Sequence, residues 1–179
     1  IPLTIYHSYR CNIKSIEVNQ LYMPYKITII TDKQLHTLNE IFHEIQSTFT
    51  CYISMSISQL LSLIVSNNIT LYTLNYKDSV LALYFIKNTQ CFHNNKEVKE
   101  IYSSYKTTGC TKEMFIEGCR QIIGKIQKTD NEIIIENIGH NTLLLDSFKS
   151  NTTSSYVTGY YLYNYIHKTV SPQNLYINV

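Results

Sequence analysis

Hydrophobic and polar positions change their spacing several times along the chain, and each change predicts a new element. Residues 13–30 alternate between apolar and polar side chains, which favours a strand that Pro24 interrupts. Thr31 with Gln34 three residues later has the pattern of a capping box, which predicts the start of a helix. The apolar residues of this helix follow at helical spacing: Leu35, Leu38, Phe42 and Ile45.

A second capping box and a hairpin follow. Ser56 with Gln59 predicts a second helix, which the polar residues 66–68 end. Residues 69–76 and 79–86 favour strands, and the two residues between them indicate the turn of a β-hairpin.

The second half of the chain alternates between strands and helices. Residues 100–107 favour a strand, and Thr111 then caps a helix with one apolar face. The apolar run 132–138 is typical of a strand covered on both faces. Asn141 caps a short helix, and residues 155–166 form a long strand. This order of elements predicts an α/β or α+β fold with a mixed sheet.

Composition limits the class of protein. The 179 residues are 44% hydrophobic and 16% charged, which suits one domain with a substantial core. A net charge of +2 without a basic run points away from nucleic acid and from anionic membranes. No apolar run approaches the roughly 20 residues of a spanning helix. Five cysteines without a C-x-x-C pair fit reduced thiols, so we expect a cytoplasmic protein.

Several short motifs are candidates for catalytic or cofactor sites. Residues 120–124, "RQIIG", resemble the start of a phosphate-binding loop, but they fall inside a predicted helix and lack the second glycine. The strand-to-helix position itself, residues 107–111, has one glycine and no basic residue. Cys91 and His93 lack a second pair of ligands at zinc spacing, and no nucleophile signature is present. We therefore expect no cofactor or metal site in this chain.

Tyrosines gather near the end of the sequence. Residues 160–165 read "YYLYNY", and strand alternation places Tyr161, Tyr163 and Tyr165 on one face. Tyr102 and Tyr105 lie on another predicted strand. Two interpretations stay open. One is an aromatic core, to which strand propensity alone gives about even odds. The other is a partly wet groove that holds a peptide, because a phenol joins an apolar body to a polar tip.

With the elements placed, the chain resembles the C-terminal half of an N-myristoyltransferase (glycylpeptide N-tetradecanoyltransferase). Residues 160–165 match the family's Tyr-Tyr-Leu-Tyr-Asn-Trp strand, with a similar distance to the chain end. Residues 6–18 share a histidine, a lysine and an Ile-Glu-Val run with a family segment. Residues 30–64 follow the family's paired helices, and residues 101–108 resemble its Ala-Tyr-Ser-Phe-Tyr-Asn strand. Two departures are the loss of a Gly-Asp-Gly loop at residues 152–159 and Ile5 in place of a tyrosine.

The resemblance implies a GCN5-related acetyltransferase-like mixed sheet flanked by helices. It also implies that residues 28–179 form the N-myristoyltransferase C-terminal domain, and that residues 1–27 lead in from a junction with an absent N-terminal half. In this family the first half carries the acyl-CoA site, so myristoyl-CoA would be a co-substrate bound mainly by that half, in a longer precursor or a second chain.

The resemblance further implies an acyltransferase that binds a peptide or protein with an N-terminal glycine. The carboxylate of Val179 would act as the base, and the substrate-binding residues would be His7, Tyr102, Ser103, Tyr105, Tyr161, Tyr163 and Asn164. The alternative is a catalytically inactive peptide-binding or structural module that has kept the fold. The sequence leaves open which of the two applies, and whether the chain is a fragment.

Overall fold

The computed structural model describes residues 3–18, 25–93, 96–127, 132–160 and 168–178. Its strands are β1 (Thr4–Asn12), β2 (Tyr25–Ile29), β3 (Cys51–Ser54), β4 (Ile69–Tyr76), β5 (Ser79–His93), β6 (Lys96–Lys106), β7 (Glu132–Glu136), β8 (Thr152–Tyr160) and β9 (Leu175–Asn178). Its α-helices are α1 (Asn39–Thr48), α2 (Ile57–Val65), α3 (Lys112–Ile126) and α4 (Asn141–Phe148), with 3₁₀ turns η1 (Asp32–Leu38), η2 (Lys149–Asn151) and η3 (Pro172–Asn174).

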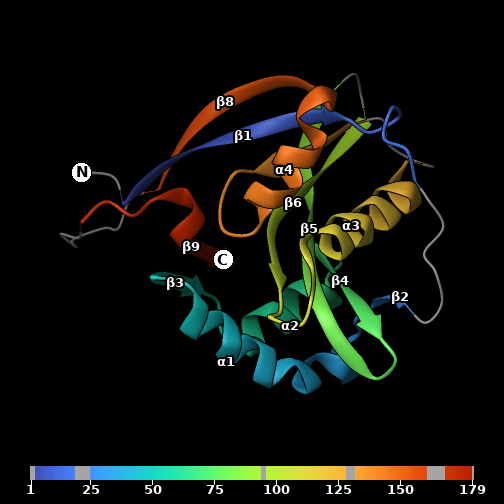
Figure 1. Ribbon diagram of the computed structural model, residues 1–179, viewed down its shortest axis with the longest axis vertical. Coiled ribbons are helices and arrows are strands. Elements are labelled where there is room, and N and C mark those ends of the chain that lie inside the picture. Colours follow the sequence, from blue (N-terminus) through green and yellow to red (C-terminus); the bar gives the residue numbers. More distant parts are fainter. Residues whose placement is uncertain (1–2, 19–24, 94–95, 128–131, 161–167, 179) are drawn as a thin grey trace.

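Seven of the described strands form one mixed sheet in the order β2-β4-β5-β6-β7-β1-β8. Only β6 and β7 pair in parallel, and the other neighbours are antiparallel. Figure 1 shows α3 and α4 on one side of this sheet and α1 and α2 on the other. The predicted α/β class with a mixed sheet flanked by helices is therefore confirmed.

Two main clusters of buried side chains hold these layers together. One joins α3 and α4 to the sheet, through residues such as Phe115, Leu144 and Ile133. The other joins η1, α1 and α2 to the opposite face, through residues such as Ile45, Leu60 and Phe85. Each layer is thus anchored by apolar burial, the main favourable term in folding.

Local signals account for the starts of two of the four described α-helices, α2 and α3. Ser56 Oγ accepts the backbone N–H of Gln59 at 3.3 Å, and Gln59 Oε1 accepts the N–H of Ser56 at 2.8 Å, so this capping box is confirmed. Thr111 Oγ1 likewise caps α3 by accepting the N–H of Met114 at 3.2 Å. The hairpin is confirmed as well: β4 and β5 flank Lys77, which has a φ of 52°.

Two predicted elements need correction, and a third is described only in part. Residues 13–18 form a turn rather than a strand, because Ile13 and Ile16 are both buried three residues apart and their backbones share a 3.1 Å hydrogen bond. A strand lies earlier, in β1. The predicted cap Asn141 is instead the first residue of α4, after His140 at the N-cap. Of the predicted strand 155–166, residues 155–160 belong to β8 and the remainder lies outside the described residues.

A small second sheet was not predicted. β3 and β9 pair in parallel, with Ser54 opposite Asn178, and Figure 1 shows the two strands side by side. This pair brings the final described residues against the segment between α1 and α2.

Candidate functional site

Strand β6 carries three of the predicted site residues and has an irregular register against β5. Phe85 pairs with Ser103 while the next residue of β5 pairs with Ile101, so Tyr102 is an extra residue on β6. Such a β-bulge changes the alternation of side chains locally. Tyr102 and Tyr105 consequently lie in the same core cluster, on the face that α1 and α2 cover.

The C-terminal strand β9 lies inside the domain rather than on its surface. All four of its residues are buried, and Asn178 is only 1% exposed. The backbone N–H of Met55 donates to the carbonyl oxygen of Asn178 at 2.7 Å, and the hydroxyl of Tyr102 donates to Asn178 Oδ1 at 2.6 Å. Val179 lies outside the described residues. The residue before it, Asn178, accepts hydrogen bonds at both its backbone carbonyl and its side chain, which hold it in place.

Aromatic rings surround this strand. Tyr176 stacks on Tyr52 with ring centroids 5.7 Å apart, and Tyr105 stacks on His140 at 5.1 Å. Burial, and secondarily the charge of Lys106, lowers the pKa of His140 to about 4, while burial raises the pKa of Tyr105 to about 12. At neutral pH the imidazole is therefore uncharged and the phenol keeps its proton.

The start of α4 closes the gap where β6 and β7 separate. These strands pair only over Lys99–Ile101 and Ile133–Ile135. Beyond that point His140 Nδ1 accepts the backbone N–H of Lys106 at 3.0 Å, and Asn141 Nδ2 donates to the carbonyl of Ile101 at 3.1 Å. Ser104 also donates to the Asn141 side chain. Side chains of this chain thus satisfy the open edge of β6.

The loop between β6 and α3 is the position where a phosphate would meet a helix N-terminus. Here the backbone N–H of Thr108 donates to the carboxylate of Glu44 at 3.1 Å. A bound anion would therefore meet the negative charge of Glu44. Residues 120–124 lie inside α3, as predicted, and so cannot form such a loop.

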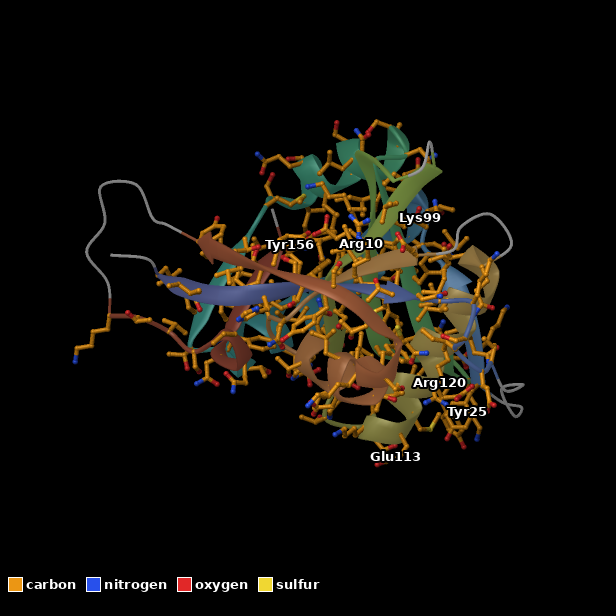
Figure 2. All side chains as sticks on the ribbon, turned by 90° about the horizontal axis from the view of Figure 1, so that it is seen from above. Arg10, Tyr25, Lys99, Glu113, Arg120 and Tyr156 are labelled. Atoms are coloured by element: carbon orange, nitrogen blue, oxygen red, sulfur yellow. The ribbon has the colours of Figure 1, made fainter. Side chains whose placement is uncertain are left out.

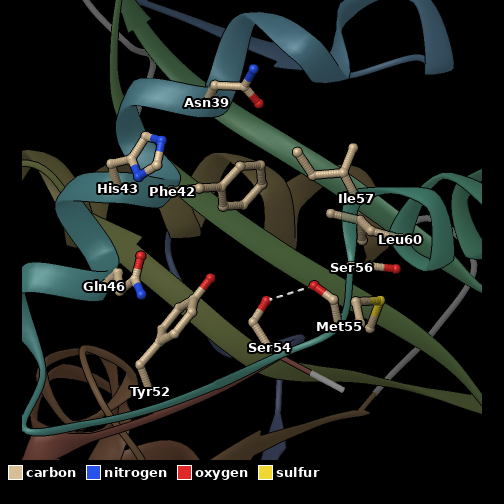
Figure 3. A pocket seen from close by; sticks show the side chains of 10 residues that line it. All are labelled: Asn39, Phe42, His43, Gln46, Tyr52, Ser54, Met55, Ser56, Ile57 and Leu60. Atoms are coloured by element: carbon tan, nitrogen blue, oxygen red, sulfur yellow. Dashed lines mark hydrogen bonds between the residues drawn. The ribbon is translucent and has the colours of Figure 1, made fainter.

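A pocket of about 230 Å³ opens beside the β3–β9 pair. Figure 3 shows side chains from α1 and α2 on two of its sides and the segment from β3 to Ser56 along another. Apolar side chains such as Phe42 and Leu60 line it together with amide, imidazole and hydroxyl groups. The lining residues are Asn39, Phe42, His43, Gln46, Tyr52, Ser54, Met55, Ser56, Ile57 and Leu60.

The structure brings some predicted site residues together and separates another. Tyr102, Ser103 and Tyr105 lie at the buried β9 strand, and each is at most 6% exposed. They support the end of the described chain rather than line an open surface. His7 lies on the opposite face of the sheet, exposed, with its ring centroid 5.9 Å from that of Tyr9. Tyr161, Tyr163, Asn164 and Val179 lie outside the described residues, so their roles stay predictions.

Sequence reasoning missed the pocket and Asn178. A strand of four residues in a tail gives too short a pattern to recognise, and the parallel partner of that strand lies more than a hundred residues earlier in the sequence. Among the described residues, no group of three or more histidine, cysteine, aspartate or glutamate side chains could hold a metal ion. None of the described helices combines the length and the apolar character that a membrane crossing needs.

Comparison with known proteins identifies the fold. No protein-family model and no curated protein matches the sequence. Two structures of Saccharomyces cerevisiae N-myristoyltransferase with bound myristoyl-CoA match with TM-scores of 0.69 and 0.71 at 12% and 14% identity, over 96% and 97% of this chain. An aminoglycoside acetyltransferase from an uncultured soil sample, in complex with sisomicin, matches 80% of this chain with a TM-score of 0.53 at 16% identity.

The fold is that of the GCN5-related acetyltransferases. The chain spans about half the length of the N-myristoyltransferases, of which it covers 53% and 51%, but 97% of the aminoglycoside acetyltransferase. At these identities the likeness establishes an acyltransferase fold and leaves the reaction to be argued from the residues.

Proposed function

We propose that this chain is the peptide-binding part of an N-myristoyltransferase-like acyltransferase. It would bind a peptide or protein with an N-terminal glycine, and the glycine amine would receive a myristoyl group from myristoyl-CoA. The observation that carries the proposal is the buried β9 strand, which holds Asn178 at the core face of β6 next to a pocket. The similarity of nearly the whole chain to about half of an N-myristoyltransferase supports it.

The chemistry assigned to Val179 depends on its surroundings and requires that the protein end at this residue. An N-terminal amine has a reference pKa of about 7.7–8.0 and must lose a proton before it can attack a thioester. A terminal carboxylate has a reference pKa of about 3.5, so in water it is a weak base. Burial next to Asn178 would disfavour the charged form and make the carboxylate a better proton acceptor, and its pairing with the incoming ammonium would offset part of the desolvation.

Two contacts support the idea that another part supplies acyl-CoA. Glu44 occupies the N–H of Thr108 in the β6–α3 loop, and His140 occupies the N–H of Lys106 at the edge of β6. Neither group is then free to bind the phosphates or the amide groups of a CoA ester. A first half of the enzyme, in the same polypeptide or a second one, would provide that site.

The same two contacts also favour the alternative of an inactive module. A chain that keeps the fold and a peptide pocket without an acyl-CoA site could act as a binding or structural protein. They disfavour a third class, a small-molecule acetyltransferase that binds CoA by itself. That class deserves a test because the single-domain aminoglycoside acetyltransferase matches most of this chain.

The test is transfer of myristoyl from myristoyl-CoA to a glycine-first peptide, followed by mass spectrometry. It compares this chain alone with the longest polypeptide that its gene encodes, whose sequence upstream of Ile1 should contain an acyl-CoA half if the enzyme is a single chain. Transfer by the longer polypeptide only is the expected result. Binding of the peptide without transfer by either protein would favour the inactive module instead.

A further inference from the structure

The pocket beside the β3–β9 pair has a lining without charged groups. None of the ten described residues that line it is an aspartate, glutamate, lysine or arginine. A charged group of a ligand would lose its hydration there without gaining a charged partner, which is costly. The lining therefore favours an uncharged ligand.

Large apolar side chains enter this pocket from three segments of the chain. Figure 3 shows Phe42 of α1 pointing toward Ile57 and Leu60 of α2. Tyr52 of β3 and Met55, directly after that strand, line another side. Phe42, Tyr52 and Met55 are half-buried, and Ile57 is 47% exposed. Because this apolar surface still contacts water, a ligand that covers it gains hydrophobic free energy.

Neutral polar groups complete the lining. Ser54 Oγ donates to the carbonyl of Met55 at 3.0 Å, and Ser56 Oγ caps α2, so both hydroxyls act within the lining segment itself. The amides of Asn39 and Gln46 on α1 can each donate and accept hydrogen bonds. Both residues are exposed, so their amides are accessible to the backbone of a peptide at the pocket.

The volume of the pocket limits how much of a ligand it can hold. At about 30 Å³ each, roughly seven or eight water molecules would fill about 230 Å³. Pockets that enclose drug-sized ligands measure about 300–1,000 Å³. The pocket thus has room for one large side chain and is too small for a whole peptide. The rings of Phe42 and Tyr52 and the thioether of Met55 favour an aromatic or aliphatic side chain.

One wall of the pocket also holds β9 in place. The N–H of Met55 donates to the carbonyl of Asn178 at 2.7 Å, and Tyr52 stacks on the buried Tyr176 of β9 with ring centroids 5.7 Å apart. The pocket therefore adjoins the strand that leads to Val179, the residue to which the proposed function assigns the glycine amine.

We propose that this pocket binds one large uncharged side chain of the acceptor peptide, a phenylalanine or a leucine that follows the N-terminal glycine. The amides of Asn39 and Gln46 bond the adjoining peptide backbone. This inference rests on the proposed function, which makes the ligand a peptide with its amine at Val179. The two sites then select different features: Val179 selects the amine, and the pocket selects the side chain and excludes a charged one.

The experiment follows peptide binding to the whole chain by NMR, with ¹³C-labelled methionine methyl groups and no acyl donor. The chain has three methionines, Met23, Met55 and Met114, and the variant Met55→Leu identifies the resonance of the pocket. Met114 is the internal control, because it lies on α3 next to Glu113, which Figure 2 shows on the side of the sheet opposite α1 and α2.

The probes are hexapeptides that begin with glycine and otherwise contain alanine. One phenylalanine replaces alanine at each position from the second to the sixth, which covers about 17 Å of extended chain. Glutamate and lysine then replace the phenylalanine that binds most tightly. Ile57→Lys tests the pocket, and Val65→Lys is the control, because Val65 is an exposed aliphatic residue of the same helix and is not among the residues that line the pocket.

The expected result is that phenylalanine at one or two positions shifts the Met55 resonance but not that of Met114. There it should strengthen binding about tenfold relative to alanine, as expected when a large apolar side chain is buried, whereas glutamate and lysine should not. Ile57→Lys should remove this preference and Val65→Lys should keep it. An unshifted Met55 resonance, equal affinity for the phenylalanine and glutamate peptides, or the same preference in both lysine variants would each overturn the inference. The peptide series on the unaltered chain decides the matter even if a variant does not fold.

Acetylated forms of the same peptides separate this outcome from that of the proposed function. If acetylation leaves the affinity unchanged while phenylalanine still shifts Met55, the pocket stays assigned and selection of the glycine amine is contradicted. If acetylation weakens binding while no position prefers phenylalanine, the assignment of the pocket fails and the proposed function stands.

Discussion

The hydroxyl of Tyr102 lies 2.6 Å from the side-chain oxygen of Asn178 and donates a hydrogen bond to it in the core of the domain. Seventy-six positions separate the two residues in the sequence. The bulge of β6 directs Tyr102 toward β9, and the parallel pairing of β3 with β9 brings Asn178 to meet it. The end of the described chain is therefore a structural part of the domain.

Replacement of Tyr102 by phenylalanine should destabilise the domain. The variant leaves Asn178 Oδ1 without its donor in a buried position, which costs about 1–3 kcal/mol. Urea unfolding followed by circular dichroism measures the loss. Tyr76→Phe, at the half-exposed end of β4, provides the matched control and should lose much less. Equal stability of the two variants would show that the Tyr102–Asn178 bond does not hold β9 in place.

Gly118 should not tolerate alanine although it lies within a helix. An added Cβ would come within 2.5 Å of the Tyr84 hydroxyl and 3.2 Å of Leu74. Tyr84 cannot easily move, because it is fully buried and donates a 2.6 Å hydrogen bond to the carbonyl of Phe115. Overpacking of this kind costs about 1–3 kcal/mol, which outweighs the helix-propensity gain of about 1 kcal/mol.

The control for Gly118→Ala is Gly124→Ala in the same helix. Its Cβ would come within 3.0 Å of the Val18 side chain, which is 39% exposed and lies outside regular structure, so it can shift. We expect unfolding experiments to show a loss of stability for Gly118→Ala and little loss or a gain for Gly124→Ala. The opposite ranking would mean that α3 does not pack on β4 and β5 as described.

Stability should fall as pH rises from about 7 to about 8.5 because of Glu136. Burial raises its pKa to about 8 in the folded protein from an ordinary 4.5, so the folded state retains a proton that the unfolded chain has lost. The stabilisation from this proton is complete below pH 4.5 and disappears as pH rises through 8. The slope should stay below about 1.4 kcal/mol per pH unit, which is the limit when the folded state retains one proton more than the unfolded state.

His140 makes stability depend on pH in the opposite direction, at lower pH. Its pKa of about 4, against an ordinary 6.5, means that its stabilisation is complete above pH 6.5 and is lost as pH falls through 4. The window between about pH 7 and 8 therefore reports mainly on Glu136, because burial also raises the pKa values of the Cys110 and Cys119 thiols from 9.0 and these groups contribute at higher pH. Urea unfolding at several pH values should show the fall for the wild type and for the control Glu113→Gln, which changes an exposed glutamate at the start of α3. Glu136→Gln should give a flatter profile. A wild-type profile without any slope between pH 7 and 8 would contradict the raised pKa of Glu136.

Acetyl-CoA should not bind tightly to this chain alone. The Thr108 N–H is occupied by the Glu44 carboxylate, which would also repel the phosphates of the ligand. Isothermal titration calorimetry with acetyl-CoA measures this directly, and Glu44→Gln tests whether the charge is the reason. Tight binding to the unaltered chain would instead favour a single-domain acetyltransferase.

The sequence predicted elements where a local rule decides them. The capping residues Ser56 and Thr111 and the hairpin turn at Lys77 need only a few neighbouring residues, and the structure has them as predicted. The turn at residues 13–18 was predicted as a strand because the apolar residues Ile13 and Ile16, both buried, fit a loose alternation of apolar and polar positions. Asn141 looked like a cap, yet its side chain bonds the backbone of β6, a contact set by tertiary packing.

The candidate site was harder to predict than the fold, because distant segments build it. Tyr102 and Ser103 were named from the resemblance, but only the β-bulge and the β3–β9 pairing show why Tyr102 meets Asn178. The hydrogen bond between Tyr6 and Glu136 joins strands β1 and β7, and no spacing within the sequence relates these two residues. The tyrosine strand that prompted the groove interpretation lies mainly outside the described residues.

The most direct test of the central claim compares two forms of one glycine-first peptide on two forms of the chain. The peptide carries either a free or an acetylated N-terminus, and the chain ends either at Val179 or with two added residues, Gly-Ser. If the Val179 carboxylate binds the glycine amine, the unextended chain should bind the free peptide at least about tenfold more tightly than the acetylated one, as expected for a hydrogen bond to a charged group. The extension should abolish this difference in affinity without unfolding the domain. An unchanged preference for the free peptide on the extended chain would contradict the account.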